Sequence, residues 1–384
     1  PFTTLFGSYH RLVSLAIGID PYASYVSDVY QDLCGEGSYV GKGIYDVDAF
    51  EAALADRVPE NTLLSHDLFE GIFARAGLVS DIELVDEYPA RYDVAAARAH
   101  RWARGDWQLL PWVLGRRAAG GDRERSAIPL LGRWKMVDNL RRTLVAPASV
   151  LALVVGWTLP LQSAALWTGF VVVALAIPTL PPVLAGLVPG RSGISRRSHF
   201  RALFADARLA LSRTSLLLNL LAHQAWSMSD AIGRTLFRLF VSQRSLLEWV
   251  TAAQSQVSER LDLAGFYRRM AGAVMIGSTV IGLSVAGYAS APLAVPFGLL
   301  WMLSPVLARR VSRPSRVAED PLVSEVDGRA LRLIARRAWR YFDTFVTAAD
   351  NDLPPDNFQE APQPVVAHRT SPTNIGLYLL SIGT

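Results

Sequence analysis

Three short clusters of polar residues in the first third of the chain have side chains suited to catalysis or ligand binding. The first is Ser65-His66-Asp67, followed by Glu70 one helical turn later. A carboxylate such as Asp67 can take a proton from a reacting hydroxyl group. Carboxylates at the start of a helix are also common capping residues, and spacing alone favours that interpretation for Asp67.

The second cluster lies in Arg98-Ala99-His100-Arg101-Trp102. In a helix, Arg98, Arg101 and Trp102 share one face, so two guanidinium groups and an indole converge. Guanidinium groups suit phosphate oxygens, and an indole can stack on the apolar face of a sugar. The alternative is a basic helix that rests on lipid headgroups.

The third cluster is the glycine-rich stretch from Gly35 to Gly43. Its glycines lack the spacing of a Walker phosphate loop, so we interpret it as a flexible acceptor-site loop or a plain turn. Asp46-Val47-Asp48 has the letters of a metal-binding Asp-x-Asp motif, but it opens a predicted helix, which favours a role at the helix start. The single cysteine, Cys34, excludes an internal disulfide and a thiolate metal cluster and fits a reducing, cytosolic environment.

The elements that must position these clusters alternate between helical patterns and short apolar runs over residues 1–130. Helices are expected over Asp48 to Ala55, Leu68 to Ala76 and Val94 to Leu114, with a strand-like stretch within Leu78 to Val85. This mixture predicts an α/β fold that is too short to be a whole domain.

The rest of the chain is unusually apolar. Because of it, the whole chain has 51% hydrophobic and only 19% charged residues, whereas soluble domains carry about 25% charged residues. No charge occurs in the 48 residues between Arg142 and Arg191 or in the 39 between Arg269 and Arg309. One membrane crossing needs about 20 residues, so each stretch is predicted to be a transmembrane hairpin. The alternative, a buried hairpin of a soluble protein, seldom runs this long without a charge.

Basic residues set the expected orientation. They flank both hairpins and are absent from the turns expected near Pro160 and Pro292. The flanking cations are Arg133, Lys135, Arg141, Arg142, Arg191, Arg196, Arg197, Arg201, Arg268, Arg269, Arg309, Arg310, Arg313 and Arg316. The positive-inside rule then predicts four transmembrane helices with both ends in the cytoplasm. The net charge of +4 is small, and arginines beside apolar runs favour membrane lipids over nucleic acid as partners.

Residues 191–269 are predicted to form amphipathic helices that lie in the cytoplasmic headgroup layer. The uncharged stretch from Thr214 to Ser229 has 16 residues, which is short for a span. A fifth crossing there is the alternative, and it would place one end of the chain outside. In the tail, an arginine- and aromatic-rich helix is expected over Leu331 to Val346, followed by a proline-rich stretch from Asn351 to Val366.

The order of these features resembles the processive family-2-like glycosyltransferases. Longer stretches are similar to the cyclic β-1,2-glucan synthases of bacterial inner membranes, over nearly the whole chain. These stretches are GIYDVDAFEAALADRVPENTLLSHDLFEG, ARYDVAAARAHRWARGDWQLLPW, HQAWSMSDAIGRTLFRLFVSQRSLLEWVTAAQ and VVAHRTSPTNIGLYLLS.

The resemblance implies a fragment with five parts. These are the C-terminal part of a nucleotide-sugar glycosyltransferase domain (1–130), a transmembrane hairpin (131–190), interfacial helices (191–269), a second hairpin (270–309), and a linker with the start of a glycosidase-like helical domain (310–384). The location that it implies is the bacterial inner membrane.

The activity implied is the inverting transfer of glucose from UDP-glucose to a growing β-1,2-glucan. Asp67 stands where the family places its general base, and Arg101 and Trp102 match the pair expected to steady the diphosphate and the acceptor sugar. Arg98 replaces the usual Gln, which changes the hydrogen bonds available to the diphosphate. Ser65-His66 replaces the usual Thr-Glu and leaves the base in place.

A transferase of this type uses Mg²⁺ or Mn²⁺ on an Asp-x-Asp motif, which is expected upstream of residue 1. No residue of this chain is therefore predicted to bind the metal, and the chain alone is predicted to be inactive. The expected protein partners are the missing N-terminal half and the downstream glycosidase- or phosphorylase-like domains. Two alternatives are a synthase of a cellulose-like or hyaluronan-like polymer and a non-catalytic membrane transport subunit.

Overall fold

The computed structural model describes residues 25–39, 43–55, 57, 62–63, 66–79, 89, 91–115, 128–187, 196–248, 261–313 and 324–382. Within these ranges the chain is mostly helical, and the strands form one antiparallel pair. The chain divides into two compact units, Pro1–Ser315 and Arg316–Thr384, which are described separately.

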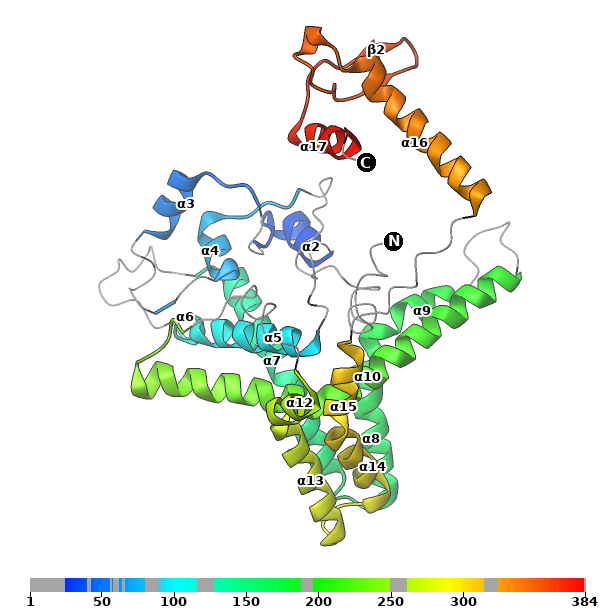
Figure 1. Cartoon of the computed structure of the whole chain (residues 1–384). Helices are drawn as coiled ribbons and strands as arrows, with labels where there is room; N and C mark the ends of the chain where they lie inside the picture. Colours follow the sequence, from blue (N-terminus) through cyan, green and yellow to red (C-terminus); the bar gives the residue numbers. More distant parts are fainter. Residues whose placement is uncertain are drawn as a thin grey trace. The chain divides into compact units, whose positions relative to one another are not determined.

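The first unit begins with the helices that carry the polar clusters (Figure 1). They are α2 (Tyr25–Cys34), α3 (Val47–Leu54), α4 (Asp67–Ala74), α5 (Tyr92–Gln108) and α6 (Leu110–Val113). The three helices expected from the sequence are thus confirmed. Asp46 caps α3 by accepting the backbone N–H of Ala49 at 2.8 Å, which confirms its predicted role at the helix start. Residues 80–85 of the strand-like stretch lie outside the described residues, and no strand occurs in the described part of 25–115.

Both long apolar stretches fold as helical hairpins. The first comprises α7 (Leu130–Gly156), α8 (Leu161–Ala176), η3 (Ile177–Thr179) and α9 (Pro181–Gly186), and the second comprises α12 (Leu263–Arg269), α13 (Ala271–Val285), α14 (Ala291–Met302) and α15 (Ser304–Val311). Pro160 and Pro292 lie at the starts of α8 and α14, where proline costs no helical hydrogen bond. The expected breaks in the two stretches are therefore confirmed.

The helices of the two hairpins do not all have the length and composition of regular transmembrane spans, of which the sequence predicts four. One described segment, Leu161–Thr179, is long and apolar enough to cross a membrane. A second segment is long and apolar enough only if the helices Ala291–Met302 and Ser304–Val311, which are bent by 46° relative to each other, are taken as one span. Ala271–Val285 is apolar but shorter, and α7 carries charged residues throughout its first half.

The segment between the hairpins contains one long helix where the sequence predicts several. It is α10 (Arg196–Phe237), 42 residues in length, and it ends in the π-helical turn η4 (Arg238–Ser242). Leu216, Leu220, Leu221, Ala222 and Ala225 of its uncharged middle part are buried against neighbouring helices. This part lacks charges because other helices surround it within the bundle.

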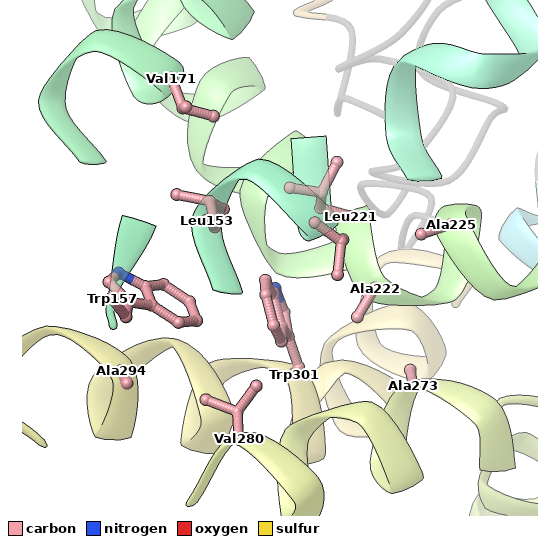
Figure 2. Close-up of a cluster of buried hydrophobic side chains, with 11 residues drawn as sticks. Leu153, Trp157, Val171, Leu221, Ala222, Ala225, Ala273, Val280, Ala294 and Trp301 are labelled. Atoms are coloured by element: carbon pink, nitrogen blue, oxygen red, sulfur yellow. The ribbon is translucent and has the colours of Figure 1, made fainter. Parts of the chain in front are cut away.

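The core where the hairpins meet α10 is shown in Figure 2. Its buried members are Val150, Leu153, Trp157, Val171, Leu221, Ala222, Ala225, Ala273, Val280, Ala294 and Trp301. The rings of Trp157 and Trp301 lie 5.9 Å apart between their centres. Each indole N–H has a partner, Thr168 Oγ1 at 3.0 Å for Trp157 and the carbonyl of Leu218 at 3.0 Å for Trp301. Buried indoles need such partners, so these bonds fix how the helices meet.

The turns of the two hairpins lie together at one end of the bundle. The backbone N–H of Ser290 donates to the carbonyl of Trp157 at 2.7 Å. Ser312, just after α15, lies at the far end of the second hairpin, where its hydroxyl accepts the backbone N–H of Tyr92 at 2.9 Å. The first turn of α5 is therefore attached to the end of the bundle opposite the turns (Figure 1).

The outer surface of the hairpins is apolar. Its exposed large side chains include Leu151, Val155, Leu161, Leu166, Phe170, Val173, Ile177, Met275, Val285, Leu299 and Leu303. Soluble monomers rarely expose this much contiguous apolar surface, so another apolar phase or protein is expected to cover it.

The second unit consists of α16 (Glu325–Phe345), η5 (Ala348–Asp350), the strand pair β1 (Phe358–Gln359) and β2 (Val365–Val366), and α17 (Pro372–Ile382). Ser324 caps α16 by accepting the backbone N–H of Asp327 at 3.1 Å. The helix expected over Leu331 to Val346 is confirmed and starts earlier, because this cap lies upstream. Trp339 of α16 stacks on Tyr378 of α17, with ring centres 6.2 Å apart.

Candidate active site

Asp67 is the first residue of α4 but does not cap it. His66 occupies the capping position, and its side chain makes no capping bond. The carboxylate of Glu70 instead accepts the backbone N–H of His66 at 3.2 Å. The capping interpretation of Asp67 is therefore wrong. In the described part of the chain, its carboxylate has no hydrogen-bond partner and remains available for chemistry.

The surroundings of Asp67 make it a stronger base than an ordinary aspartate. Its pKa is raised, first because neighbouring atoms partly remove the carboxyl from water and then because the Glu70 carboxylate lies one turn away. The positive charge of a protonated His66 acts in the opposite direction. More than a third of the Asp67 surface is still accessible, so a substrate can reach it.

The described part of the glycine-rich stretch lies against α4. A Cβ atom on Gly71 of α4 would come within 2.6 Å of the Tyr39 Cβ atom, so only glycine allows this contact. Burial raises the pKa of the Tyr39 hydroxyl, and the charges of Asp67 and Glu70 add to that effect. Tyr39 is therefore within electrostatic reach of Asp67, and the loop lies beside the candidate base.

Lys135 of α7 helps to hold this loop. Its ammonium group donates to the carbonyl of Gly37 at 3.0 Å and lies 4.6 Å from the centre of the Tyr30 ring. Only 2% of Lys135 is exposed. Lys135, one of the cations that flank the first hairpin in the sequence, is thus buried against the loop in the described structure.

Arg98, Arg101 and Trp102 share one face of α5, as their spacing predicts. The Arg98 guanidinium carbon lies 4.2 Å from the centre of the Trp102 ring. Trp102 remains 51% exposed. Burial and the nearby Arg98 charge lower the pKa of Arg101, yet arginine stays protonated in proteins. This face of α5 thus combines two cations with an accessible indole.

His66 connects the start of α4 to α5. Its Nε2 atom lies 3.2 Å from Asp106 Oδ1, and Asn139 of α7 donates to the same oxygen at 3.0 Å. Asp106 follows Trp102 by one helical turn, so the contact attaches the start of α4 to the helix that carries Arg101 and Trp102. Sequence reasoning missed Asp106 and Asn139. The four-residue spacing of Asp106 from Trp102 was the available signal.

Helix α5 is held in parallel with the second half of α10. The Tyr92 hydroxyl lies 2.6 Å from His223 Nδ1, and His100 Nε2 lies 2.9 Å from Asp230 Oδ2. Next to Tyr92, the buried carboxylate of Asp93 is paired with Arg91 at 2.5 Å. These polar contacts at the start and in the middle of α5 fix its position on the bundle.

The described residues do not fit a divalent cation site, since they include no group of three His, Cys, Asp or Glu side chains that could hold a metal ion. Asp46 is already engaged as a helix cap.

The chain is similar in sequence to a curated glucan synthase. No family model matches the chain. It is 46% identical over 377 residues to the cyclic beta-(1,2)-glucan synthase NdvB of Rhizobium meliloti (strain 1021). The match covers 98% of this chain and 13% of NdvB. The resemblance expected from the quoted stretches is confirmed, for a segment that spans 13% of the length of its relative.

Proposed function

We propose that this chain is part of a membrane-bound synthase that transfers glucose from UDP-glucose, with inversion, to a growing cyclic β-1,2-glucan. The observation that carries the proposal is the contact of His66, the residue before Asp67, with Asp106 of α5, the helix that carries Arg98, Arg101 and Trp102, in a chain 46% identical to NdvB. A basic carboxylate beside cations and an indole suits transfer of a sugar from a diphosphate.

In this mechanism Asp67 takes the proton from the 2-hydroxyl of the acceptor glucose. The freed oxygen attacks the anomeric carbon from the face opposite the bond to UDP, that bond breaks, and UDP leaves with the electron pair. The raised pKa of Asp67 and its lack of a partner among the described residues support this role. Arg98 and Arg101 would stabilise the charge that develops on the diphosphate, and Trp102 would stack on the acceptor sugar.

When bound, Mg²⁺ or Mn²⁺ would neutralise part of the diphosphate charge. Its ligands and the nucleotide site are assigned to the segment that precedes residue 1 in the relative. The chain alone is therefore proposed to be inactive. In the same scheme, residues 1–130 complete the transferase domain, and residues 310–384 are a linker and the start of a glycosidase-like domain.

The bundle is proposed to lie in the bacterial inner membrane with four crossings, made by the second half of α7 and by α8, α13 and α14. Three observations support this. Charge-free stretches of hairpin length carry an apolar outer surface, the two turns meet through Ser290 and Trp157, and α5 is attached at the opposite end. Both termini and α5 would then face the cytoplasm, where UDP-glucose is available.

Replacing Asp67 with Asn in the full-length protein tests the proposal. Labelled glucose incorporated from UDP-glucose by isolated membranes is expected to fall by about 10²–10⁴-fold, because the general base is lost. Asp48→Asn is the matched control, since Asp48 is exposed at the start of α3, and it should retain activity. Unchanged incorporation by Asp67→Asn would exclude Asp67 as the base.

A further inference from the structure

We propose that His66, held by Asp106 and Asn139, is a positioning residue that orients Asp67 for glucose transfer. The inference rests on the proposed function and adds three residues to its site. His66 stands where the motif pattern usually has Glu, whereas Asp106 and Asn139 lie outside that pattern, and each of the three comes from a different helix or helix start.

The geometry links three elements at one carboxylate. The Asp106 Oδ1 atom of α5 accepts a hydrogen bond from His66 Nε2 at 3.2 Å and another from the side-chain amide of Asn139 at 3.0 Å. The side chains of His66 and Asp106 are only 11% and 15% exposed. A Cβ on Gly105 would meet the His66 ring at 3.5 Å, an ordinary van der Waals distance, so the ring packs directly on α5. A partly buried ring held in this way has little freedom to turn.

Asp106 also decides which nitrogen of His66 carries a proton. A carboxylate only accepts hydrogen bonds, so Nε2 must donate. The other ring nitrogen, Nδ1, is buried and has no partner among the described residues. Asp106 is therefore the described residue that fixes the ring, and the ring in turn fixes the backbone from which Asp67 projects.

The second effect is electrostatic. The charged groups around His66 are Asp67 and Glu70 on α4 and Asp106 on α5, whereas Asn139 on α7 is neutral. Glu70 and burial raise the pKa of Asp67, and a protonated His66 lowers it. A base must be deprotonated to act, so a cationic His66 extends the activity of Asp67 to lower pH.

Replacing His66 with Gln separates the two effects, because the Gln amide can still donate to Asp106 but carries no charge. In membranes containing the full-length protein, the acid limb of kcat should move to higher pH by roughly one unit or less. The rate on the alkaline side and the KM for UDP-glucose should change by no more than about threefold, since Arg98 and Arg101 are untouched. His66→Ala, which loses both effects, should lower kcat at every pH.

Asp106→Asn gives a second, independent measurement in case His66→Gln reduces the amount of folded protein. It removes the carboxylate that holds the His66 ring beside the start of α4, so its acid limb should also move to higher pH. The matched control is His368→Gln, which alters a His–Asp contact of the second unit, to Asp350 at 2.9 Å. Its pH profile should coincide with that of the unmodified enzyme.

Two results are decisive. If the acid limbs of His66→Gln and Asp106→Asn both coincide with that of the unmodified enzyme, the inference is wrong while the proposed function stands. If the unmodified protein incorporates no glucose, or if Asp67→Asn leaves incorporation unchanged, it is the proposed function that fails.

Discussion

The carboxylate of Asp67 lies between two neighbours of opposite effect. Glu70 raises its pKa, and a protonated His66 lowers it. Glu70→Gln should therefore move the acid limb of the transfer rate to lower pH, opposite in sign to the His66→Gln shift. The amide oxygen of Gln can still accept the His66 N–H, so α4 should keep its start. The measurement is initial rate against pH, and an upward shift would contradict the assignment.

Arg101 is expected to act through the geometry of its guanidinium group. Lysine keeps the charge but lacks the planar pair of donors that matches phosphate oxygens. Arg101→Lys should lower kcat/KM for UDP-glucose by about ten- to a hundred-fold. Arg340→Lys, at an exposed position of α16, is the control. If Arg101→Lys and Arg340→Lys had the same kcat/KM for UDP-glucose, Arg101 would lie outside the diphosphate site.

The sequence predicts the residues of the site better than their partners. Arg98, Arg101 and Trp102 share a face because one helical period determines it, and a family resemblance indicates Asp67. The His66–Asp106 contact joins residues 40 positions apart. Lys135 belongs by type to the flanking cations, and only the folded loop shows that it is buried. Such contacts depend on tertiary structure, which local patterns do not encode.

Helices α13 and α14 approach each other closely at two glycines. A Cβ on Gly277 would meet the carbonyl oxygen of Gly298 at 2.6 Å, whereas a Cβ on Gly282 of the same helix would meet nothing within 4 Å. Gly277→Leu should destabilise the protein by about 1–3 kcal/mol through overpacking, whereas Gly282→Leu should not. Thermal unfolding of the detergent-solubilised full-length protein measures this, and similar losses in both variants would refute the close contact.

The hairpins themselves follow from local signals, since charge-free runs and prolines determine them. The long helix α10 does not. Its uncharged middle part has the composition of a short span, a surface helix or a buried helix, and only contacts with other helices distinguish these. Its residues Leu221, Ala222 and Ala225 contact the core shown in Figure 2. The sequence predicts that this segment is helical, but it does not predict where the helix lies in the bundle.

For the molecule as a whole, the orientation of the bundle can be tested at the turns. Leu159 and Tyr288 are exposed, one in each turn. Single cysteines at these positions, in a cysteine-free full-length protein, should both react with a membrane-impermeant maleimide in intact spheroplasts. A cysteine at Arg329 of α16 should react only after the membrane is opened. Labelling of one turn without the other would contradict the proposed four crossings.

The hydrogen bond between the backbone of Tyr92 and the hydroxyl of Ser312 spans 220 residues of sequence. A ribosome adding about 5–20 residues per second needs roughly 10–40 s to make that interval. During this time the start of α5 lacks this anchor, although Arg98, Arg101 and Trp102 have already been made. On the proposed function, a nascent chain would therefore acquire its fully anchored site only after the second hairpin has left the ribosome.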